Sequence, residues 1–581
     1  MAVMFALTLT LGMGTRVYAE GTAEGPYTIT INKNSTDKAA HTYGAYQIFK
    51  GDLKEEGEGT TKTTVLSNIQ WGDNVTPATL ITNLKGIDAF KDLAVNASAA
   101  TVAKAISDAN LAKDSDGAKA LADAIAASVT SPKGTAEIAA DATSGTITGL
   151  PAGYYVVKDT AAVSGEGAST RYILEVVSNV TVTEKASIPT VIKKVKEKND
   201  SEAAAEGTNP TDWQDGADYD IGDYVPFKIT GKTADRADEY YKYHVTFIDD
   251  QSEGLDAPKQ FKITVLGEEL TLANEAEATA TVTVKKIKIT ASIVAAGADF
   301  QIKVAFENTD NEGKTEGFVK LGDAVKSQDI VVEYTSKLNE SAVIGTPGNP
   351  NEVNMKFSNN PNLTDDSEEG ETPKDKVVVF TYEIKALKVE PTSDAAIDQA
   401  AYEALSDAQK AEYVKVGDKY QKTQALSGAG FTLYKKVGSD YVQVGEEITG
   451  KTTFEFKGTD AGEYKLVETT VPGGYNKADD IEIKVEATYN TDSADPKLTS
   501  LTVSPDTAGF VVESTSTTTG EGDDAVTTTT YSGNIVGKIL NQKGSTLPST
   551  GGIGTTIFYV LGGLLVAGAG IVLVARKKAA E

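Results

Sequence analysis

Cysteine is absent from this chain of 581 residues, so no disulfide can stabilise any of its domains. Histidine is nearly absent: only His41 and His244 occur, which leaves no Cys/His metal site and little scope for a Ser-His-Asp triad. Positive charge is also scarce, and the net charge of -28 argues against nucleic acid or an anionic membrane surface as a partner. These absences predict no metal site, no cofactor and no nucleic-acid partner.

The C-terminal stretch has three consecutive features. An uncharged run from Ile553 to Ala575 is as long as the roughly 20 residues that a membrane-spanning helix needs. The basic residues 576–578 follow it and mark a cytoplasmic end, which places the preceding chain outside the cell. Pro548 lacks an amide proton and keeps the segment before the run extended and accessible. That segment is the pentapeptide Leu547, Pro548, Ser549, Thr550 and Gly551.

The three features together resemble the cell-wall sorting signal of Gram-positive surface proteins. The resemblance implies that a sortase cleaves between Thr550 and Gly551. The alternative is a single-pass membrane protein in which the pentapeptide is accidental.

Residues 1–19 have the pattern of a secretion signal. An apolar stretch from Ala2 to Leu11 is followed by Val17-Tyr18-Ala19, a small-x-small pattern suited to signal peptidase. The basic leader of such signals is missing, so we expect the true start to lie upstream of Met1.

The chain between these ends alternates apolar and polar residues in many short runs, which predicts strands. We expect an all-β protein of tandem Ig-like β-sandwiches, with helical inserts in the first and third domains and a C-terminal transmembrane helix. The expected divisions are 1–19 for the signal, 20–188, 189–375 and 376–546 for three domains, and 547–581 for the sorting signal and span.

Four segments interrupt or connect the expected strands. The Ala-rich stretch Thr101 to Val129 predicts helices in the first domain, and Asp394 to Tyr413 predicts a helical insert in the third. The acidic, Pro-containing stretch Thr364 to Asp375 predicts a linker. The Thr/Ser-rich stretch Ser514 to Ser532 predicts a loop or a flexible hairpin.

Several motifs resemble those of Gram-positive pilins. In the middle domain, Pro189–Val195, Phe247–Leu255 and Asn351–Pro361 resemble the fimbrial isopeptide-forming domain. In the third domain, Leu426–Tyr434 and Tyr464–Tyr475 resemble the Cna-B-type domain and the E-box of major pilin subunits. Together with LPSTG, the resemblance covers nearly the whole mature chain and implies Cna-type sandwiches in a shaft-forming, or backbone, pilin.

The resemblance also implies an intramolecular amide between a lysine amine and an asparagine side chain, assisted by a carboxylate. The lysine must be neutral to act as a nucleophile, and the carboxyl group must be protonated to polarise the amide. Burial in an apolar core favours both states. Because side chains alternate across a strand, the strand phase shows which candidates point inward.

In the third domain the phase selects one residue of each kind. Lys388 is in phase with Phe380, whereas Lys385 lies on the polar face. Glu468 and Asn541 are likewise in phase with apolar neighbours. We therefore predict an isopeptide bond between Lys388 and Asn541, with Glu468 as the assisting carboxylate.

In the middle domain the phase favours Lys193 as the nucleophile and Asp249 as the catalytic carboxylate. Asn351 and Asn359 share one apolar face, so the phase leaves both open as the acceptor. The family pattern favours Asn351.

The first domain gives a weaker pattern. Lys33, Asp159 and Asn179 are each in phase with apolar neighbours, and Lys50 is an equal rival of Lys33. Because Asp stands where the E-box has Glu, we predict no isopeptide bond there.

Polymerisation requires an exposed lysine that a sortase acyl-enzyme can reach. Lys185 lies on the polar face of its strand, at the seam between the first two domains. The family has Val-Tyr-Pro-Lys at this place, and this chain has Val182-Thr-Glu-Lys185, without Tyr or Pro. We predict Lys185 as the polymerisation lysine; a solvated linker lysine is the alternative.

These features predict the major structural subunit of a sortase-assembled pilus, anchored in the cell wall. The implied partners are sortases, other pilin subunits in a covalent homopolymer, peptidoglycan and a host surface. The alternative is a wall-anchored adhesin or tip pilin that binds host matrix. A wall-anchored hydrolase is disfavoured because no nucleophile elbow, metal motif or carboxylate pair occurs in a recognisable context, and we expect no enzyme.

Overall fold

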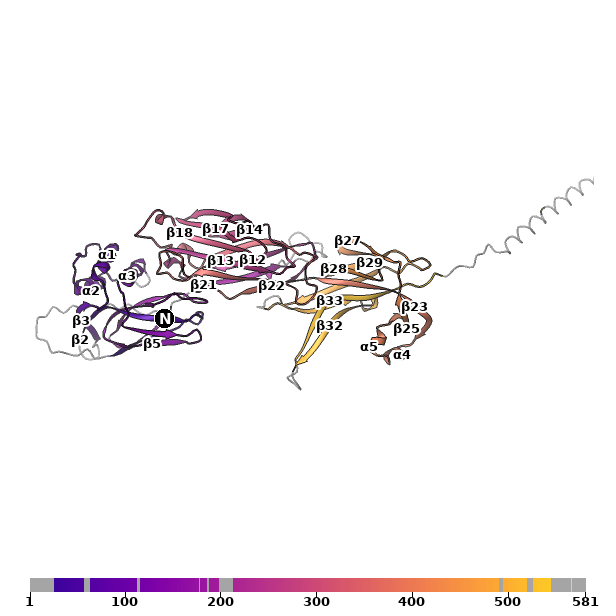
Figure 1. Cartoon of the computed structure of the whole chain (residues 1–581), viewed down its shortest axis with the longest axis horizontal. Helices are drawn as coiled ribbons and strands as arrows, with labels where there is room; N and C mark the ends of the chain where they lie inside the picture. The colour runs from indigo at the N-terminus through magenta and orange to yellow at the C-terminus, as the bar shows by residue number, and fades with distance from the viewer. Residues whose placement is uncertain are drawn as a thin grey trace, which may run out of the picture.

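The computed structural model describes residues 26–56, 63–111, 115–176, 178–184, 188–197, 213–490, 495–519, 526–544 and 566. These residues form three β-sandwiches that follow one another along the long axis of the molecule (Figure 1). The all-β fold of tandem sandwiches is therefore confirmed. The expected secretion signal, and all but one residue of the expected membrane span, lie outside the described residues. Within the described part of the chain, every helix is too short or too polar to cross a membrane.

The first domain packs a three-stranded sheet, in the order β5-β1-β8, against a five-stranded sheet, β3-β2-β6-β7 with β4 on β2. The first and last strands of the domain, β1 and β8, are parallel neighbours, with Ile29 opposite Val180. The strands are β1 (Tyr27–Asn32), β2 (His41–Glu56), β3 (Thr63–Trp71), β4 (Gly134–Ile138), β5 (Ser144–Leu150), β6 (Gly153–Asp159), β7 (Arg171–Val176) and β8 (Val180–Thr183).

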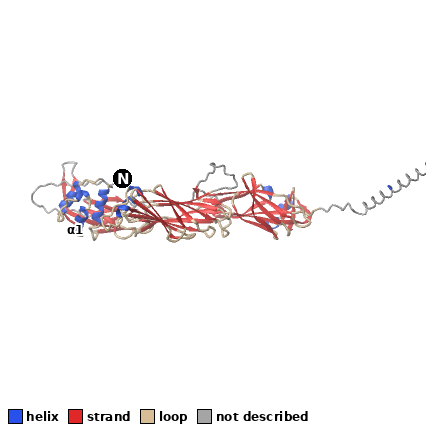
Figure 2. Cartoon of the chain, turned by 90° about the horizontal axis from the view of Figure 1, so that it is seen from above, coloured by secondary structure: helices blue, strands red, loops and turns tan. Residues whose placement is uncertain are grey.

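Helices cover the outer face of the five-stranded sheet. They are the blue elements near the label α1 in Figure 2. They are α1 (Pro77–Lys85), α2 (Ala99–Asp108) and α3 (Asp116–Ala126), with the 3₁₀ turn η2 (Asp88–Phe90). Ser98 and Ser115 cap α2 and α3 by accepting hydrogen bonds from backbone amides. Strand β6 is consequently buried on both faces: Tyr155 and Val157 face the sandwich core, and Tyr154 and Val156 face the helices. The helices predicted between Thr101 and Val129 are present, and α1 precedes them.

The middle domain is the largest sandwich, and its sheets are β10-β9-β12-β19-β14-β15 and β11-β22-β20-β13-β18-β17-β16 with β21 on β20. Alternating apolar residues of both sheets form one continuous core. The elements are β9 (Thr190–Lys196), β10 (Trp213–Gln214), β11 (Gly216–Asp218), β12 (Tyr224–Lys232), η3 (Ala237–Glu239), β13 (Lys242–Gln251), β14 (Gln260–Val265), β15 (Glu268–Ala273), β16 (Thr279–Val284), β17 (Ile287–Ala295), β18 (Gln301–Asn308), η4 (Thr309–Asn311), η5 (Asp323–Val325), β19 (Asp329–Lys337), β20 (Asn349–Ser358), β21 (Glu369–Glu371) and β22 (Asp375–Phe380).

The linker expected at Thr364 to Asp375 is wrong, because this segment packs on the middle domain. Strand β21 pairs with β20, and Asp366 contacts the ring of His244. The boundary expected after residue 375 is also too early, since β22 pairs with β20 and β11 of the middle sheet. The side chains of β22 alternate between two cores: Val377 and Val379 face the middle core, and Val378 and Phe380 face the third.

The third domain packs the sheet β24-β25-β23-β33-β32, with β28 on β23, against β27-β26-β29-β30-β31. Its first and last strands, β23 and β33, are parallel neighbours, with Lys388 opposite Ile539. The elements are β23 (Tyr382–Ile397), α4 (Gln399–Glu403), α5 (Asp407–Lys410), β24 (Tyr413–Val416), β25 (Lys419–Ala425), β26 (Gly430–Val437), β27 (Asp440–Thr449), β28 (Thr453–Thr459), β29 (Gly462–Thr470), β30 (Ile481–Tyr489), β31 (Leu498–Ser504), η6 (Asp506–Ala508), β32 (Phe510–Thr519) and β33 (Val526–Leu540).

The helical insert of the third domain is shorter than the predicted stretch Asp394 to Tyr413. Strand β23 continues to Ile397, and two short helices follow, capped by Asp398 and Ser406. Of the two alternatives for Ser514 to Ser532, the structure has the hairpin, formed by β32 and β33 and projecting from the body of the domain (Figure 1).

A buried charge cluster joins the middle and third domains. Lys435 Nζ lies 2.6 Å from Asp220 Oδ2 and 2.7 Å from Asp460 Oδ1. Asp218 Oδ2 accepts a hydrogen bond from the Ala461 amide at 3.3 Å, and burial raises the pKa of Asp218 to about 6. One lysine thus serves carboxylates from both domains.

Candidate functional site

Three polar side chains meet in the core of the middle domain. Lys193 comes from β9 in one sheet, and Asp249 and Asn351 come from β13 and β20 in the facing sheet. Their exposed fractions are 0%, 1% and 0%. Lys193 Nζ donates hydrogen bonds to Asp249 Oδ2 and Asn351 Oδ1. The two sheets are therefore linked across the core at this point.

Tyr334 and Gln251 position the other atoms of this group. The Tyr334 hydroxyl donates to Asp249 Oδ2 at 3.1 Å and accepts from Asn351 Nδ2 at 3.0 Å. Gln251 Oε1 also lies 3.3 Å from Asn351 Nδ2. The Phe227 ring stands 5.8 Å from Lys193 Nζ and helps to exclude water. The amide oxygen of Asn351 is thereby turned toward the lysine.

Burial shifts the protonation of both ionisable partners in the direction that amide chemistry needs. Desolvation lowers the pKa of Lys193, although Asp249 opposes this shift. Desolvation raises the pKa of Asp249 to about 6, against the stabilising charge of Lys193. Both shifts favour transfer of the proton from the Lys193 amine to the Asp249 carboxylate, which leaves a neutral amine beside a neutral carboxylic acid. The group then holds a nucleophile, an electrophilic amide and a proton carrier within contact distance.

A second group of the same composition lies in the third domain. Lys388 Nζ on β23 lies 2.6 Å from Asn541 Oδ1 and 3.0 Å from Glu468 Oε1 on β29. Asn541, directly after β33, donates through Nδ2 to Glu468 Oε1 at 2.9 Å. The exposed fractions of the three residues are 0%, 1% and 1%. Burial lowers the pKa of Lys388, and the Phe431 ring covers its amine at 5.2 Å.

The alternative acceptor in the middle domain has a different environment. Asn359 Nδ2 donates to the Val163 carbonyl at 2.6 Å and the Gly167 carbonyl at 3.2 Å, both in the first domain. Asn359 therefore contributes to a domain junction, and Asn351 is the asparagine that contacts Lys193.

The candidates of the first domain do not come together in the described residues. Lys33 Nζ donates to the Ala140 carbonyl at 2.8 Å, and its rival Lys50 pairs with Asp73 at 2.6 Å on the surface. Asp159 contacts His41 instead. Asn179 is exposed, because β7 ends at Val176 and the chain turns before β8. The expectation that Asn179 points inward is wrong, because β7 and β8 are separate strands and the alternation of β7 does not continue to Asn179.

Sequence reasoning missed a buried cluster in the first domain. His41 Nδ1 lies 2.9 Å from Asp159 Oδ1, and its Nε2 faces Asp37 and Glu184. Burial alone would lower the pKa of His41, but the hydrogen bond to Asp159, the close contact with Asp37 and the nearby carboxylate charges raise it to about 10. Burial raises the pKa of Asp159 and of Glu184. The residues come from separate segments, and only the spacing Asp37-x-x-x-His41 gave a local signal.

Two predicted sites lie outside the described residues. They are the polymerisation lysine, Lys185, and the cleavage motif Leu547 to Gly551. Glu184, the residue before Lys185, is described and is 3% exposed.

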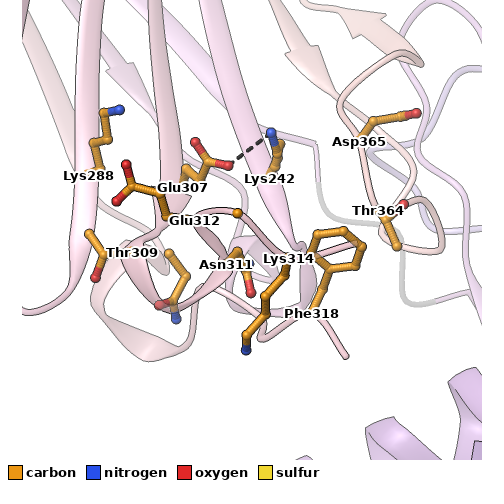
Figure 3. Close-up of a pocket in the computed structure, with 12 residues that line it drawn as sticks. Lys242, Lys288, Glu307, Thr309, Asn311, Glu312, Lys314, Phe318, Thr364 and Asp365 are labelled. Carbon is orange, nitrogen blue, oxygen red and sulfur yellow. Dashed lines mark ion pairs between the residues drawn. The ribbon is translucent and has the colours of Figure 1, made fainter. Parts of the chain in front are cut away.

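A surface pocket of about 420 Å³ lies beside the strands of the middle domain (Figure 3). Lys242, Lys288, Glu307 and Phe318 are among its lining residues, and Lys242 pairs with Glu307 at 2.9 Å. Its lining contains no serine, cysteine or histidine.

Two segments match known families. Residues 412–497 match the SpaA family, described as a prealbumin-like fold domain, and residues 539–581 match the LPXTG cell wall anchor motif. The chain is 27% identical over 321 residues to the trypsin-resistant surface T6 protein of Streptococcus pyogenes serotype M6. That match covers 48% of this chain and 53% of the relative, so the chain matches about half of the relative's length.

Two of the solved structures that match align with about nine-tenths of the chain. The T6 backbone pilin of serotype M6 Streptococcus pyogenes has 17% identity and a TM-score of 0.47, covering 90% of this chain and 100% of that one. The full-length major pilin SpaD from Corynebacterium diphtheriae has 14% identity and a TM-score of 0.40, covering 91% and 100%. The family matches and the T6 relative confirm the resemblance to Gram-positive pilins, and the anchor match confirms the expected sorting signal.

Proposed function

We propose that this chain is the backbone subunit of a covalently polymerised pilus, stiffened by two intramolecular isopeptide bonds. The observation that carries the proposal is the pair of buried groups Lys193-Asp249-Asn351 and Lys388-Glu468-Asn541. Burying a lysine beside a carboxylate costs desolvation free energy. An amide bond between the lysine and the neighbouring asparagine would remove the buried amine and its charge. The pilin resemblance and the anchor motif agree with such a bond.

The proposed route to each bond uses the three residues of each group. The neutral lysine Nζ attacks Cγ of the asparagine while the protonated carboxyl group polarises the amide oxygen. The carboxylate carries a proton from Nζ to the departing Nδ2, the C–Nδ2 bond breaks, and ammonia leaves. Each domain performs the reaction once on itself, so the role is structural and the group is not a turnover site.

The bonds would join strands that are far apart in the chain. Lys193 and Asn351 are 158 residues apart, and Lys388 and Asn541 are 153 residues apart. By the loop-entropy treatment used for disulfides, closing a loop of this size is worth about 5 kcal/mol. In the third domain, Lys388 and Asn541 belong to the first strand and the end of the last, so a pull on both domain ends would run through the bond.

Assembly would use the two ends of the domain string. A sortase would cleave after Thr550 and hold that threonine as an acyl-enzyme, and Lys185 of the next subunit would resolve it. Peptidoglycan would accept the last subunit of the fibre. Sortases, further copies of this chain and peptidoglycan are the partners of this proposal.

Intact mass spectrometry of the purified full-length chain tests the internal bonds. Each bond releases ammonia, so the mass should lie about 17 Da below that of the sequence per bond, or about 34 Da for both. Lys193→Ala should abolish one deficit, and Lys194→Ala, which alters the neighbouring lysine on β9, should retain both. An unshifted wild-type mass would reject the bonds.

Polymerisation is tested separately on wall extracts. Lys185→Arg should abolish the ladder of high-mass species on a denaturing gel while leaving a monomer with both internal bonds. An unchanged ladder would assign the role to another lysine, and absence of any wild-type ladder would favour a solitary adhesin.

A further inference from the structure

The two histidines of this chain have similar carboxylate neighbours and different hydrogen bonding. His244 is satisfied on both nitrogens: Nδ1 lies 2.7 Å from Asp366 and Nε2 lies 2.7 Å from Glu369, both with hydrogen-bond geometry. His41 is satisfied only at Nδ1. Its side chain is fully buried, and its Nε2 makes no hydrogen bond within the described residues.

His41 Nε2 nevertheless points at two carboxylate oxygens. It lies 3.2 Å from Asp37 Oδ1 and 3.3 Å from Glu184 Oε1, and all three atoms lie within 4.8 Å of one another. Neither contact has hydrogen-bond geometry. Ligand atoms about 2.0–2.1 Å from a tetrahedral ion lie about 3.3 Å apart, which matches both separations.

The other ring nitrogen of His41, Nδ1, contacts a carboxylate, as the non-ligating nitrogen of metal-binding histidines commonly does. His41 Nδ1 can donate to Asp159 Oδ1 at 2.9 Å, so a metal ion that displaces the Nε2 proton would meet a ring lone pair directed at Asp37 and Glu184. Backbone amides fix the carboxylates in turn: the amides of Ala39 and Ala168 donate to Asp37, and the amide of Asn34 donates to Glu184. The Tyr43 hydroxyl donates to Glu184 Oε1 itself, so the ring and both carboxylates are held in place from outside.

The charges within this cluster also favour a cation. Asp37 is 2% exposed, Glu184 is 3% exposed and Asp159 is half-buried. Among the described residues, His41 is the basic side chain that faces all three carboxylates. A single imidazolium leaves net negative charge in this buried space, whereas a divalent ion would compensate more of it.

We propose that Asp37, His41 and Glu184 bind a divalent transition-metal ion of the Zn²⁺ type, with Asp159 as the residue that orients His41. The imidazole ligand disfavours Ca²⁺ and Mg²⁺, which prefer oxygen ligands only. The site goes beyond the proposed function and assigns the first domain its own stabilising device. The ion joins the segment after β1, the start of β2 and the end of β8.

The test uses the full-length chain in detergent, stripped with EDTA, desalted and titrated with Zn²⁺ alone. We expect one tightly held Zn²⁺ per chain by elemental analysis, and visible absorption bands of a tetrahedral site when Co²⁺ replaces it. His41→Gln and Glu184→Gln should abolish both signals. His244→Gln, the matched change at the fully hydrogen-bonded histidine, should leave them unchanged.

Asp159→Asn provides a graded test of the orienting role, and should weaken Zn²⁺ binding about 10–100-fold without changing the stoichiometry. Circular dichroism checks that each variant is folded, and Glu184→Gln, nearly isosteric, is the decisive variant if His41→Gln does not fold. The proposal is overturned if the wild-type chain retains no Zn²⁺ after desalting, or if folded Glu184→Gln retains as much as the wild type.

Discussion

The first and third domains begin and end alike but are tied differently. In each, the first and last strands are parallel neighbours, β1 with β8 and β23 with β33. Where the pairing of β23 with β33 ends, Lys388 meets Asn541. At the end of β1 and β8, Asp37 and Glu184 converge on His41. The same position in the sandwich thus holds reactive partners in one domain and metal-binding partners in the other.

The difference concerns reversibility. Parallel neighbours that receive the pull from both ends of a domain depend on whatever joins them, because their backbone hydrogen bonds are loaded together. An amide between Lys388 and Asn541 would be permanent once ammonia has left, whereas a metal bound by His41 could leave and return. The middle domain differs from both, because Lys193 and Asn351 belong to facing sheets and a bond between them would join the two sheets.

The strongest way to break the comparison is to remove the assisting carboxylates. Asp249→Asn and Glu468→Gln should each prevent one bond, because no group would then carry the proton between amine and amide. We expect a loss of about 5 kcal/mol in the affected domain and a melting temperature lower by about 10–20 °C, measured by calorimetry on the full-length chain. Asp250→Asn, at the exposed neighbour of Asp249, should change neither mass nor melting.

How far this contrast could be foreseen depends on strand regularity. Lys193, Asp249 and Glu468 are each buried between two more exposed neighbours on their strands, so their phase identified the buried face directly. Counting failed at Asn179, where a turn interrupts the strand and resets the phase.

Two other features could not be predicted correctly from local sequence. The acidic, Pro-containing stretch Thr364 to Asp375 has the content of a linker, yet it packs through β21 and the carboxylate of Asp366. The spacing of Asp37 and His41 gave only part of the His41 cluster, because Asp159 and Glu184 come from separate segments that only the fold brings close to it. Local pattern predicts the face of a residue, and long-range pairing decides its partners.

The junction between the middle and third domains gives a second, smaller way to test the comparison. Lys435→Met should leave Asp220 and Asp460 without their shared cation and cost about 3–5 kcal/mol. Lys436→Met, which removes a surface pair with Glu463, should cost less than about 1 kcal/mol. Calorimetry should show the two transitions of these domains separating in the first variant. Equal effects of the two changes would contradict a coupled junction.

Tyr334→Phe should affect the rate of bond formation more than final stability. The hydroxyl contacts both Asp249 and Asn351, and the third domain has no tyrosine among the contacts described for its group. Losing this hydrogen bond should slow formation of the Lys193 bond by about 10-fold, since about 1.4 kcal/mol in a barrier is a factor of 10. Mass spectrometry of newly folded chain would follow the two deficits separately, after digestion. A slowed Lys388 bond would show that the change acts indirectly.

The smallest expected effect concerns the lysines of the first domain. Lys33→Met removes hydrogen bonds to backbone carbonyls and should cost about 1 kcal/mol, and Lys50→Met removes a surface pair and should cost less. Neither should alter the total mass deficit of the chain, because neither lysine contacts an asparagine side chain in the described residues. A deficit reduced by about 17 Da in either variant would reveal a third bond. The first domain would then resemble the third in chemistry as well as in strand order, and its stability would no longer depend on the ion at His41.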